Sequence, residues 1–306
     1  MNIRIVHGFA GLAVSTFAQT STPKPTQSGR QLDMEKEKPM KATSVAILLL
    51  SMLVAGMAAA QTSTPRATET AGSLYDNFNQ NFIDPSKWSA IWQCGSPAME
   101  CVREIENGQL RLRVRAYGAT DANDGTQFAT SAVNLTAASV KDISAQVIIR
   151  NSNPKDCTAN AGVAHSQALV FGAFFNGGGG TAADDVVAYL QLDRYVASGP
   201  GTVEVGGFLQ YQGQFFANVD LGLVNIGEKV MVRLQWDQPN HRFVAHLARP
   251  TYGTNVEQSM PYSISDTNAA VAPFKSLSAN VFPPNCAGTA IPADLDVSFD
   301  NVRVSE

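Results

Sequence analysis

The chain has 306 residues, of which 44% are hydrophobic and 16% charged, a composition typical of globular proteins. Its formal net charge is −4, and residues 61–306 alone carry −7, because six basic and three acidic residues lie before residue 61. A negative domain of this kind argues against nucleic acid, an anionic membrane surface or an acidic polysaccharide as partner, since each requires a basic face.

Residues 1–60 end in a stretch typical of a secretory signal peptide. Basic residues precede the apolar run 42–60, which finishes in three alanines before Gln61. We expect cleavage after Ala60; a membrane anchor is the alternative, because about 19 apolar residues can just span a bilayer. The mature protein is then extracellular or periplasmic and has no membrane contact. Residues 61–73, rich in Thr, Ser, Pro and Ala, are expected to form a flexible linker.

Four cysteines lie in the exported part, and an even number in a secreted chain indicates disulfides. They are Cys94, Cys101, Cys157 and Cys286. Of the three possible pairings we favour Cys94 with Cys101, because these two flank a short turn-like loop, which leaves Cys157 with Cys286. A metal site is the weaker alternative, since no CxxC pair and no histidine cluster accompanies the cysteines.

Residues 74–306 show the pattern of one all-β domain. Residues 108–116 alternate strictly, with Leu110, Leu112 and Val114 inward and arginines outward. Clusters of Gly, Pro and Asn separate the expected strands. Many short strands with this spacing predict a two-sheet antiparallel β-sandwich or jelly roll. The other expected strands are 128–135, 143–150, 168–176, 182–195, 203–212, 229–237, 243–247, 277–282 and 295–304.

The segment 182–195 has two chemically different faces. Read with period two, one face is oily and the other is polar and aromatic. We therefore expect the oily face to pack into the core and the other to line a groove the size of a sugar. The oily face consists of Val186, Ala188, Leu190 and Leu192, and the polar face of Asp185, Val187, Tyr189, Gln191 and Asp193.

Three segments resemble the concanavalin A-like lectin/glucanase family. Residues 76–88 (DNFNQNFIDPSKW) look like the family's opening, 107–112 (NGQLRL) like the strand that follows, and 297–304 (VSFDNVRV) like its closing strand. The segments occur in the family's order and bracket the exported domain. The resemblance implies a jelly roll over residues 74–306, with an oligosaccharide or polysaccharide as partner.

The family's β-glucan hydrolases carry alternating carboxylates, Glu-x-Asp-x-Glu or Glu-x-Asp-x-x-Glu, on one strand of the concave face. In the corresponding segment of this chain only Asp185 and Asp193 are acidic, and eight residues separate them by roughly 26 Å. They cannot act on one glycosidic bond, which needs carboxylates about 5 to 10 Å apart. The pair Glu104 and Glu106 comes too early in the chain. No catalytic residue is assigned, and we expect a non-catalytic member of the family.

The sequence therefore predicts a secreted carbohydrate-binding or recognition domain. Aromatic faces stack on sugar rings, while amide and carboxylate side chains pair with hydroxyl groups. A glycoside hydrolase or polysaccharide lyase of the same fold is one alternative, and a structural or adhesive extracellular domain is the other. The groove candidates are Trp92, Tyr189, Gln191, Tyr211, Arg233, Gln235 and Asp237.

The resemblance also implies a structural calcium ion. In the family's glucanases an Asp of the closing strand and backbone carbonyls of the opening segment and an Asn-Gly turn hold the cation. Asp300 matches the closing-strand Asp, Gly108 the turn, and Asp76 lies in the opening segment. Oxygen ligands of this type suit Ca²⁺. The alternative is that Asp300 only hydrogen-bonds the first strand.

Overall fold

A computed structural model describes residues 72–92, 98–123 and 125–306, apart from the side chains of Ile91 and Trp92. Strands dominate it, and three short 3-10 helices, η1 (Ala182–Asp184), η2 (Gln238–Asn240) and η3 (Pro250–Tyr252), are its helical elements. The strands are β1 (Ser73–Asp76), β2 (Trp88–Trp92), β3 (Met99–Glu106), β4 (Gln109–Tyr117), β5 (Ala129–Leu135), β6 (Asp142–Ser152), β7 (His165–Asn176), β8 (Asp185–Tyr195), β9 (Thr202–Tyr211), β10 (Gln214–Asn225), β11 (Lys229–Asp237), β12 (Arg242–Arg249), β13 (Thr254–Pro261), β14 (Asn268–Phe282) and β15 (Pro292–Ser305).

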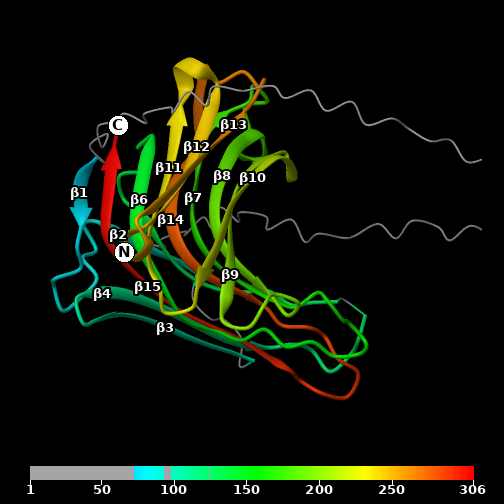
Figure 1. Cartoon of the computed structure of the whole chain (residues 1–306). Helices are drawn as coiled ribbons and strands as arrows, with labels where there is room; N and C mark the ends of the chain where they lie inside the picture. Colours follow the sequence, from blue (N-terminus) through cyan, green and yellow to red (C-terminus); the bar gives the residue numbers. More distant parts are fainter. Residues whose placement is uncertain (1–71, 93–97, 124) are drawn as a thin grey trace, which may run out of the picture. The chain divides into compact units, whose positions relative to one another are not determined.

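The strands form two antiparallel sheets. Sheet A has the order β13-β12-β11-β6-β15-β4-β3, with β1 also paired to β15, and sheet B has the order β10-β9-β8-β7-β14-β5-β2. Both sheets bend in the same direction, so that β8 and β9 lie on the inner side of the bend and β3 and β4 on the outer side (Figure 1). The predicted all-β, two-sheet sandwich is confirmed.

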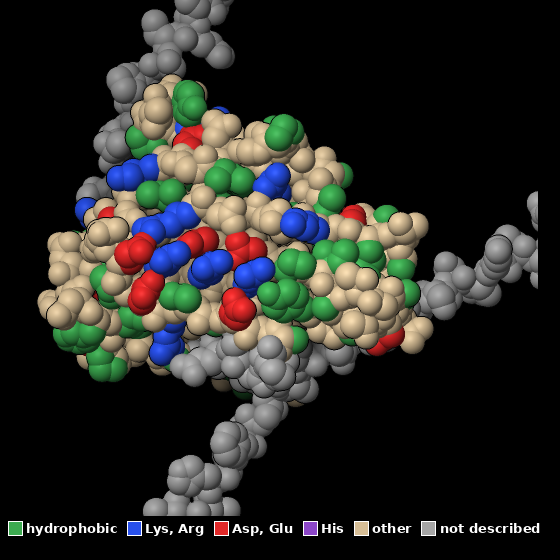
Figure 2. Space-filling model, turned by 90° about the horizontal axis from the view of Figure 1, so that it is seen from below, with side chains coloured by type: hydrophobic (Ala, Val, Ile, Leu, Met, Phe, Trp, Pro, Cys, Tyr) green, Lys and Arg blue, Asp and Glu red, His purple; other side chains and the backbone are tan. Residues whose placement is uncertain are grey.

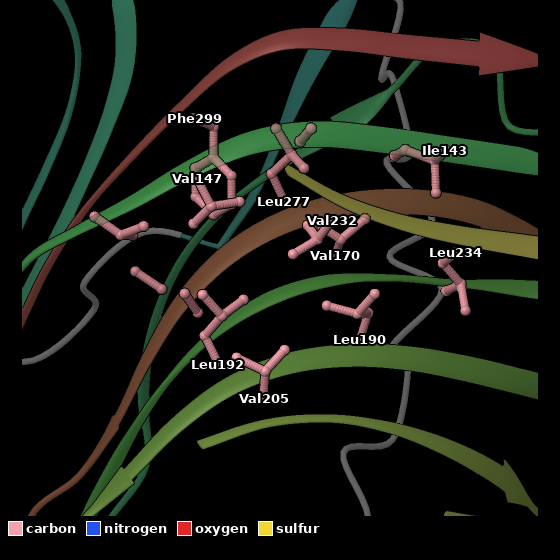
Figure 3. Close-up of a cluster of buried hydrophobic side chains, with 14 of the residues drawn as sticks. Ile143, Val147, Val170, Leu190, Leu192, Val205, Val232, Leu234, Leu277 and Phe299 are labelled. Atoms are coloured by element: carbon pink, nitrogen blue, oxygen red, sulfur yellow. The ribbon is translucent and has the colours of Figure 1, made fainter. Parts of the chain in front are cut away.

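The core lies between the sheets and consists of the inward residues that the period-two pattern predicts. In β4, Leu110, Leu112 and Val114 are fully buried. In β8, Leu190 and Leu192 belong to the same buried cluster as Val147, Val232 and Phe299 of sheet A (Figure 3). Full burial of one such side chain stabilises the fold by about 1.5 to 3 kcal/mol, so this layer is the main reason the two sheets stay together.

The opening segment folds around the buried carboxylate of Asp76. Its Oδ1 accepts the backbone N–H of Phe78 at 3.0 Å, and its Oδ2 accepts the indole N–H of Trp88 at 2.7 Å. The Phe78 and Trp88 rings stack with their centroids 5.4 Å apart. Asp76 therefore fixes both the backbone at Phe78 and the ring of Trp88, and the two rings stack on each other.

One predicted disulfide is confirmed. Cys157, in the loop before β7, is bonded to Cys286, in the loop before β15, across 129 residues of sequence. Cys94 lies outside the described residues, so its bond to Cys101 stays a prediction. The leader and residues 61–71 also lie outside them, so signal cleavage and the linker stay predictions. In the part of the chain that the structure describes, no helix is long and apolar enough to cross a bilayer.

Candidate functional site

The register of sheet B places side chains from β14, β7, β8 and β9 in rows on its outer face, away from the core. In one row Ser276, Phe171, Tyr189 and Phe208 oppose one another in turn. Because successive residues of a strand point to opposite faces, the outer face consists of the residues two apart from these. The aromatic, amide and carboxylate side chains described next lie on this face.

An aromatic strip crosses the strands in and beside this row. Phe171 stacks on Tyr189, with centroids 5.4 Å apart and planes 8° apart, and contacts Phe274 edge-on at 5.4 Å. Phe215 of β10 lies edge-on to both Tyr189 and Phe208, each at 5.9 Å. We call these five residues the aromatic strip. Phe215 is 59% exposed and therefore presents the most accessible ring of the strip.

A polar band follows on the same face, towards the C-terminal end of β8. Gln167 opposes both Asp193 and Asn280, and its Nε2 donates to Asp193 Oδ2 at 3.1 Å. Gln191 donates to the same oxygen at 3.4 Å. We call Gln167, Gln191, Asp193 and Asn280 the polar band. Its amide groups offer the hydrogen-bonding capacity that sugar hydroxyls require.

Two carboxylates oppose each other across β8 and β9 at the end of this band. Asp193 is directly opposite Glu204, and such pairs have their Cβ atoms about 4.5 to 5.5 Å apart. Burial raises the pKa of Asp193, and Glu204 adds to the rise, while His165 and the bond from Gln167 act in the opposite direction. Asp193 Oδ1 has no hydrogen-bond partner among the described residues. We call Asp193 and Glu204 the acidic pair.

A second aromatic group lies beyond the acidic pair. The His165 ring stacks between Phe282, at 3.9 Å, and Tyr195, at 5.0 Å, and Phe128 packs against Phe282 at 5.1 Å. Burial raises the pKa of the Tyr195 hydroxyl, and the charges of Asp193 and Glu204 add to this. The outer face of sheet B therefore consists of aromatic rings, amides, carboxylates and aromatic rings again, in that order along the strands.

The structure brings together only some of the groove residues predicted from sequence. Tyr189 and Gln191 lie two residues apart on the outer face of sheet B, as predicted. The Tyr189 hydroxyl donates to Gln210 at 2.8 Å, and burial raises its pKa to about 12. Trp92 pairs with Ala132 at the β2 edge of the sheet, and its side chain lies outside the described part. Tyr211 packs against the core instead, on the opposite face.

Three predicted groove residues belong to sheet A. Arg233 and Gln235 point outward from β11, where the Arg233 Nη2 donates to Asp142 at 2.6 Å. Asp237 ends the same strand and accepts from Arg242 at 2.7 Å, which lowers its pKa. One groove cannot hold these residues together with Tyr189, because the sandwich lies between them. The prediction that Arg233, Gln235 and Asp237 share one groove with Tyr189 is therefore corrected.

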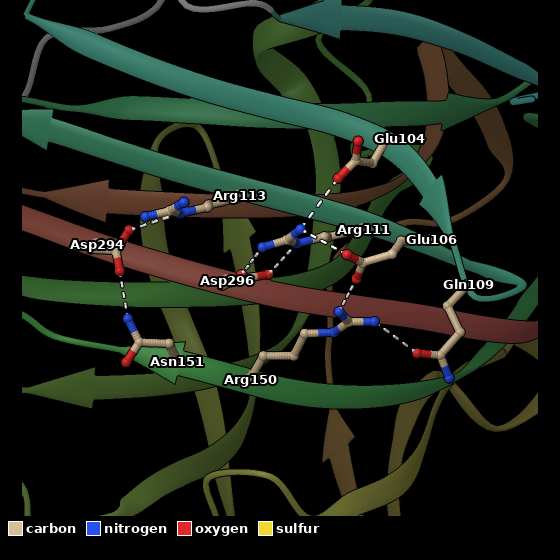
Figure 4. A network of polar contacts seen from close by, with 9 residues as sticks. All are labelled: Glu104, Glu106, Gln109, Arg111, Arg113, Arg150, Asn151, Asp294 and Asp296. Carbon is tan, nitrogen blue, oxygen red and sulfur yellow. Dashed lines mark hydrogen bonds and ion pairs between the residues drawn. The ribbon is translucent and has the colours of Figure 1, made fainter.

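The outer face of sheet A carries an ion-pair network. Arg111 lies 2.6 Å from Asp296 and 3.0 Å from Glu106, Arg113 lies 3.3 Å from Asp294, and Arg150 also pairs with Glu106 (Figure 4). Figure 2 shows acidic and basic side chains side by side across this face. Glu104 also contacts Arg111, so the early Glu104 and Glu106 pair belongs to the network.

Two of the predicted calcium ligands, Asp76 and Asp300, lie near each other, but their carboxylate oxygens already accept hydrogen bonds from the protein. Asp76 opposes Val302, two residues from Asp300. Burial raises the pKa of Asp300, and the nearby charge of Asp76 adds to it. Asp300 accepts the backbone and side-chain N–H groups of Asn301 at 2.7 and 3.1 Å. Each oxygen keeps a further lone pair, so the residues fit one weak cation, although Lys87 lies 3.6 Å from Asp76. No cluster of three metal-ligating side chains occurs among the described residues.

Comparison with protein families and with curated proteins finds no match. Solved structures that match include lectin II from Ulex europaeus, at 12% identity over 75% of this chain and 96% of that chain, with a TM-score of 0.30. A GlcNAcα1-4Gal-releasing endo-β-galactosidase from Clostridium perfringens matches at 12% identity over 75% of this chain and 61% of that chain, with a TM-score of 0.40. Scytalido-glutamic peptidase matches at 13% identity over 59% and 79%, with a TM-score of 0.33. No conclusion about function follows from likenesses at this level.

Proposed function

We propose that the outer face of sheet B binds an oligosaccharide. The observation that carries this proposal is the aromatic strip next to the polar band, on a single face. Rings supply flat apolar surface for the faces of sugars, and amides supply directional hydrogen bonds.

Export supports a role in recognising extracellular glycans. The Cys157–Cys286 disulfide requires an oxidising compartment in most organisms. The apolar run 42–60, which ends in small residues, has the pattern of a signal peptide that directs export. A glycan array and polysaccharide pull-downs with the protein from residue 61 onward test the proposal. Retention of no glycan in either experiment would contradict it.

Phe215→Ala is expected to weaken oligosaccharide binding by about 1 to 3 kcal/mol with little loss of stability. Phe215 is 59% exposed and lies at the surface of the strip, so its ring is available to a ligand and contributes little to the core. Titration calorimetry with a glycan retained on the array gives the affinity, and thermal melting gives the stability.

Tyr252→Ala is the matched control, because Tyr252 is similarly exposed at 55% but follows β12 of sheet A. Its removal should leave the affinity unchanged. Tyr189→Ala should reduce both binding and stability, since its ring packs between Phe171 and Phe215. Equal losses of affinity for Phe215→Ala and Tyr252→Ala would remove the aromatic strip from the site.

Glycoside hydrolysis is the second candidate function, and the acidic pair is the observation that favours it. One carboxyl with a raised pKa beside a second carboxylate is the arrangement that general acid catalysis of this reaction uses. A reducing-sugar release assay on each retained glycan tests it. Activity that disappears in both Asp193→Asn and Glu204→Gln would support hydrolysis, and no release by the unmodified protein would reject it.

Calcium binding between Asp76 and Asp300 remains a proposal with its own test. If Ca²⁺ binds only the folded protein, a concentration 100 times its dissociation constant stabilises the fold by about 2.7 kcal/mol. The melting temperature should therefore rise with calcium, and Asp300→Asn should remove most of the rise. Asp121→Asn, in an exposed loop, is the control and should keep it. A melting temperature indifferent to calcium and to chelator would reject the site.

A further inference from the structure

The carboxylates on the outer faces of the two sheets differ in their ion-pair partners. On the outer face of sheet A, Asp294 and Asp296 each pair with an arginine (Figure 4), and Asp142 pairs with Arg233. On the outer face of sheet B, neither Asp193 nor Glu204 forms an ion pair with a lysine or arginine among the described residues. Glu204 accepts a hydrogen bond from the Ser198 hydroxyl at 3.5 Å.

The lysine and arginine side chains of sheet B are engaged elsewhere. Its seven described strands contain two, Arg194 and Lys275, and both lie elsewhere. Arg194 donates to the backbone carbonyl of Ser152 on β6. Lys275 is 1% exposed and donates to the carbonyls of Ala138 and Ala173. Among the described strands of sheet B, the side chain that opposes the negative charge of Asp193 is His165.

The surroundings of the acidic pair suit a ligand cation. Asp193 is 2% exposed, and its Oδ1 has no hydrogen-bond partner among the described residues, so in its ionised form it adds negative charge next to Glu204. Glu204 is exposed and can reach the ligand directly. The rings of Tyr195 and His165 lie alongside, and aromatic faces attract an ammonium group. Carboxylates and rings together are a recognised arrangement for binding a positively charged amine.

We infer that the acidic pair binds the ammonium group of an amino sugar, so that the site prefers oligosaccharides with free amines over neutral or N-acetylated ones. This inference rests on the proposed oligosaccharide-binding function and names the ligand class of the same site. A sugar amine fits better than a free cation, because the polar band and the aromatic strip continue from the acidic pair along the face and would contact the neighbouring sugar units.

The test compares a tetramer of glucosamine with a tetramer of N-acetylglucosamine by titration calorimetry, at a mildly acidic pH where the free amines are charged. The glucosamine tetramer should bind about tenfold or more tightly, since a hydrogen bond to a charged group contributes about 1.5 to 3 kcal/mol. Glu204→Gln should remove most of this preference and leave the affinity for the acetylated tetramer unchanged. Asp193→Asn should also remove most of the preference, and because Asp193 holds Gln167 and Gln191 of the polar band, it should weaken the binding of both tetramers.

Two controls separate an amine-specific site from unspecific attraction between charges. Glu104→Gln makes the same charge change in the network of sheet A and should have no effect; a loss equal to that of Glu204→Gln would show unspecific attraction and overturn the inference. A lysine tetrapeptide that binds as tightly as the glucosamine tetramer would overturn it as well. If Asp193→Asn fails to fold, the exposed Glu204→Gln still decides.

Equal affinity for both sugars contradicts the amine preference alone. Binding of neither sugar, together with a blank glycan array, contradicts the proposed oligosaccharide-binding function.

Discussion

Replacing Lys275 with Met should abolish a rise in stability between about pH 7 and pH 9. Lys275 is 1% exposed, and burial lowers its pKa from 10.5 to about 7. Below pH 7 the lysine is protonated in both states, and the folded protein bears the full cost of burying the charge. Above pH 7 the unfolded chain binds more protons than the folded one, so the free energy of unfolding rises with pH.

The expected rise is about 2 to 3 kcal/mol over those two pH units, because each unit corresponds to about 1.4 kcal/mol when one proton separates the two states. Guanidinium unfolding at several pH values measures it. Lys155→Met, in an exposed loop, is the control and should keep the slope of the unmodified protein. Identical slopes for Lys275→Met and the unmodified protein would show that Lys275 is not the group that titrates.

Removing the Cys157–Cys286 disulfide should produce a still larger effect. The bond closes a loop of 129 residues, for which the chain-entropy model gives a stabilisation of about 5 kcal/mol. Whole domains are stable by only about 5 to 15 kcal/mol, so the double variant Cys157→Ser, Cys286→Ser should unfold at a much lower denaturant concentration. The bond also ties the loop before β7 to the loop before β15, at one end of the sandwich.

Denaturant unfolding of the double variant and of the unmodified protein under oxidising conditions measures this difference. Serine is close in size to cysteine, so the comparison reports mainly the cross-link. The slope of the transition should also increase in the variant, because its unfolded chain exposes more surface. A transition midpoint within error of the unmodified protein would contradict the expected contribution.

The sequence predicted the architecture well where strands alternate regularly. The inward positions of β4 and of β8 follow the period-two pattern and are buried as expected. β10 was missed because two register shifts, between Phe215 and Ala217 and between Asp220 and Gly222, break its alternation. β13 was missed because it is an edge strand whose side chains are mostly exposed and polar, so it carries little hydrophobic signal.

The candidate site was predicted only in part, for a physical reason. Alternation within β8 correctly placed Tyr189 and Gln191 on one face, but alternation cannot show which sheet a strand joins. Arg233 and Gln235 alternate just as well and lie on the other sheet. The acidic pair was missed because its members come from different strands, and their opposition depends on the register of β8 with β9. The alternation of Thr202–Tyr211 was the one available signal for Glu204.

Asp185 illustrates a second limit of pattern reading. Its position predicts a side chain on the polar face, yet the carboxylate is 5% exposed. It accepts the backbone N–H groups of Val271 and Ala272, both at 2.8 Å, where the pairing of β14 with β7 is interrupted. The carboxylate at the start of β8 therefore supports β14, two strands away in the sheet, and of the two acidic residues of β8 only Asp193 belongs to the polar band.

The most direct test of the central claim is an NMR titration of the domain with an oligosaccharide retained on the glycan array. Binding on the outer face of sheet B predicts that the largest chemical-shift changes occur at Phe171, Gln191 and Phe215. Residues on the outer face of sheet A, such as Arg111 and His246, should not shift. Changes confined to sheet A, or a saturated complex without changes in β7 to β10, would contradict the claim.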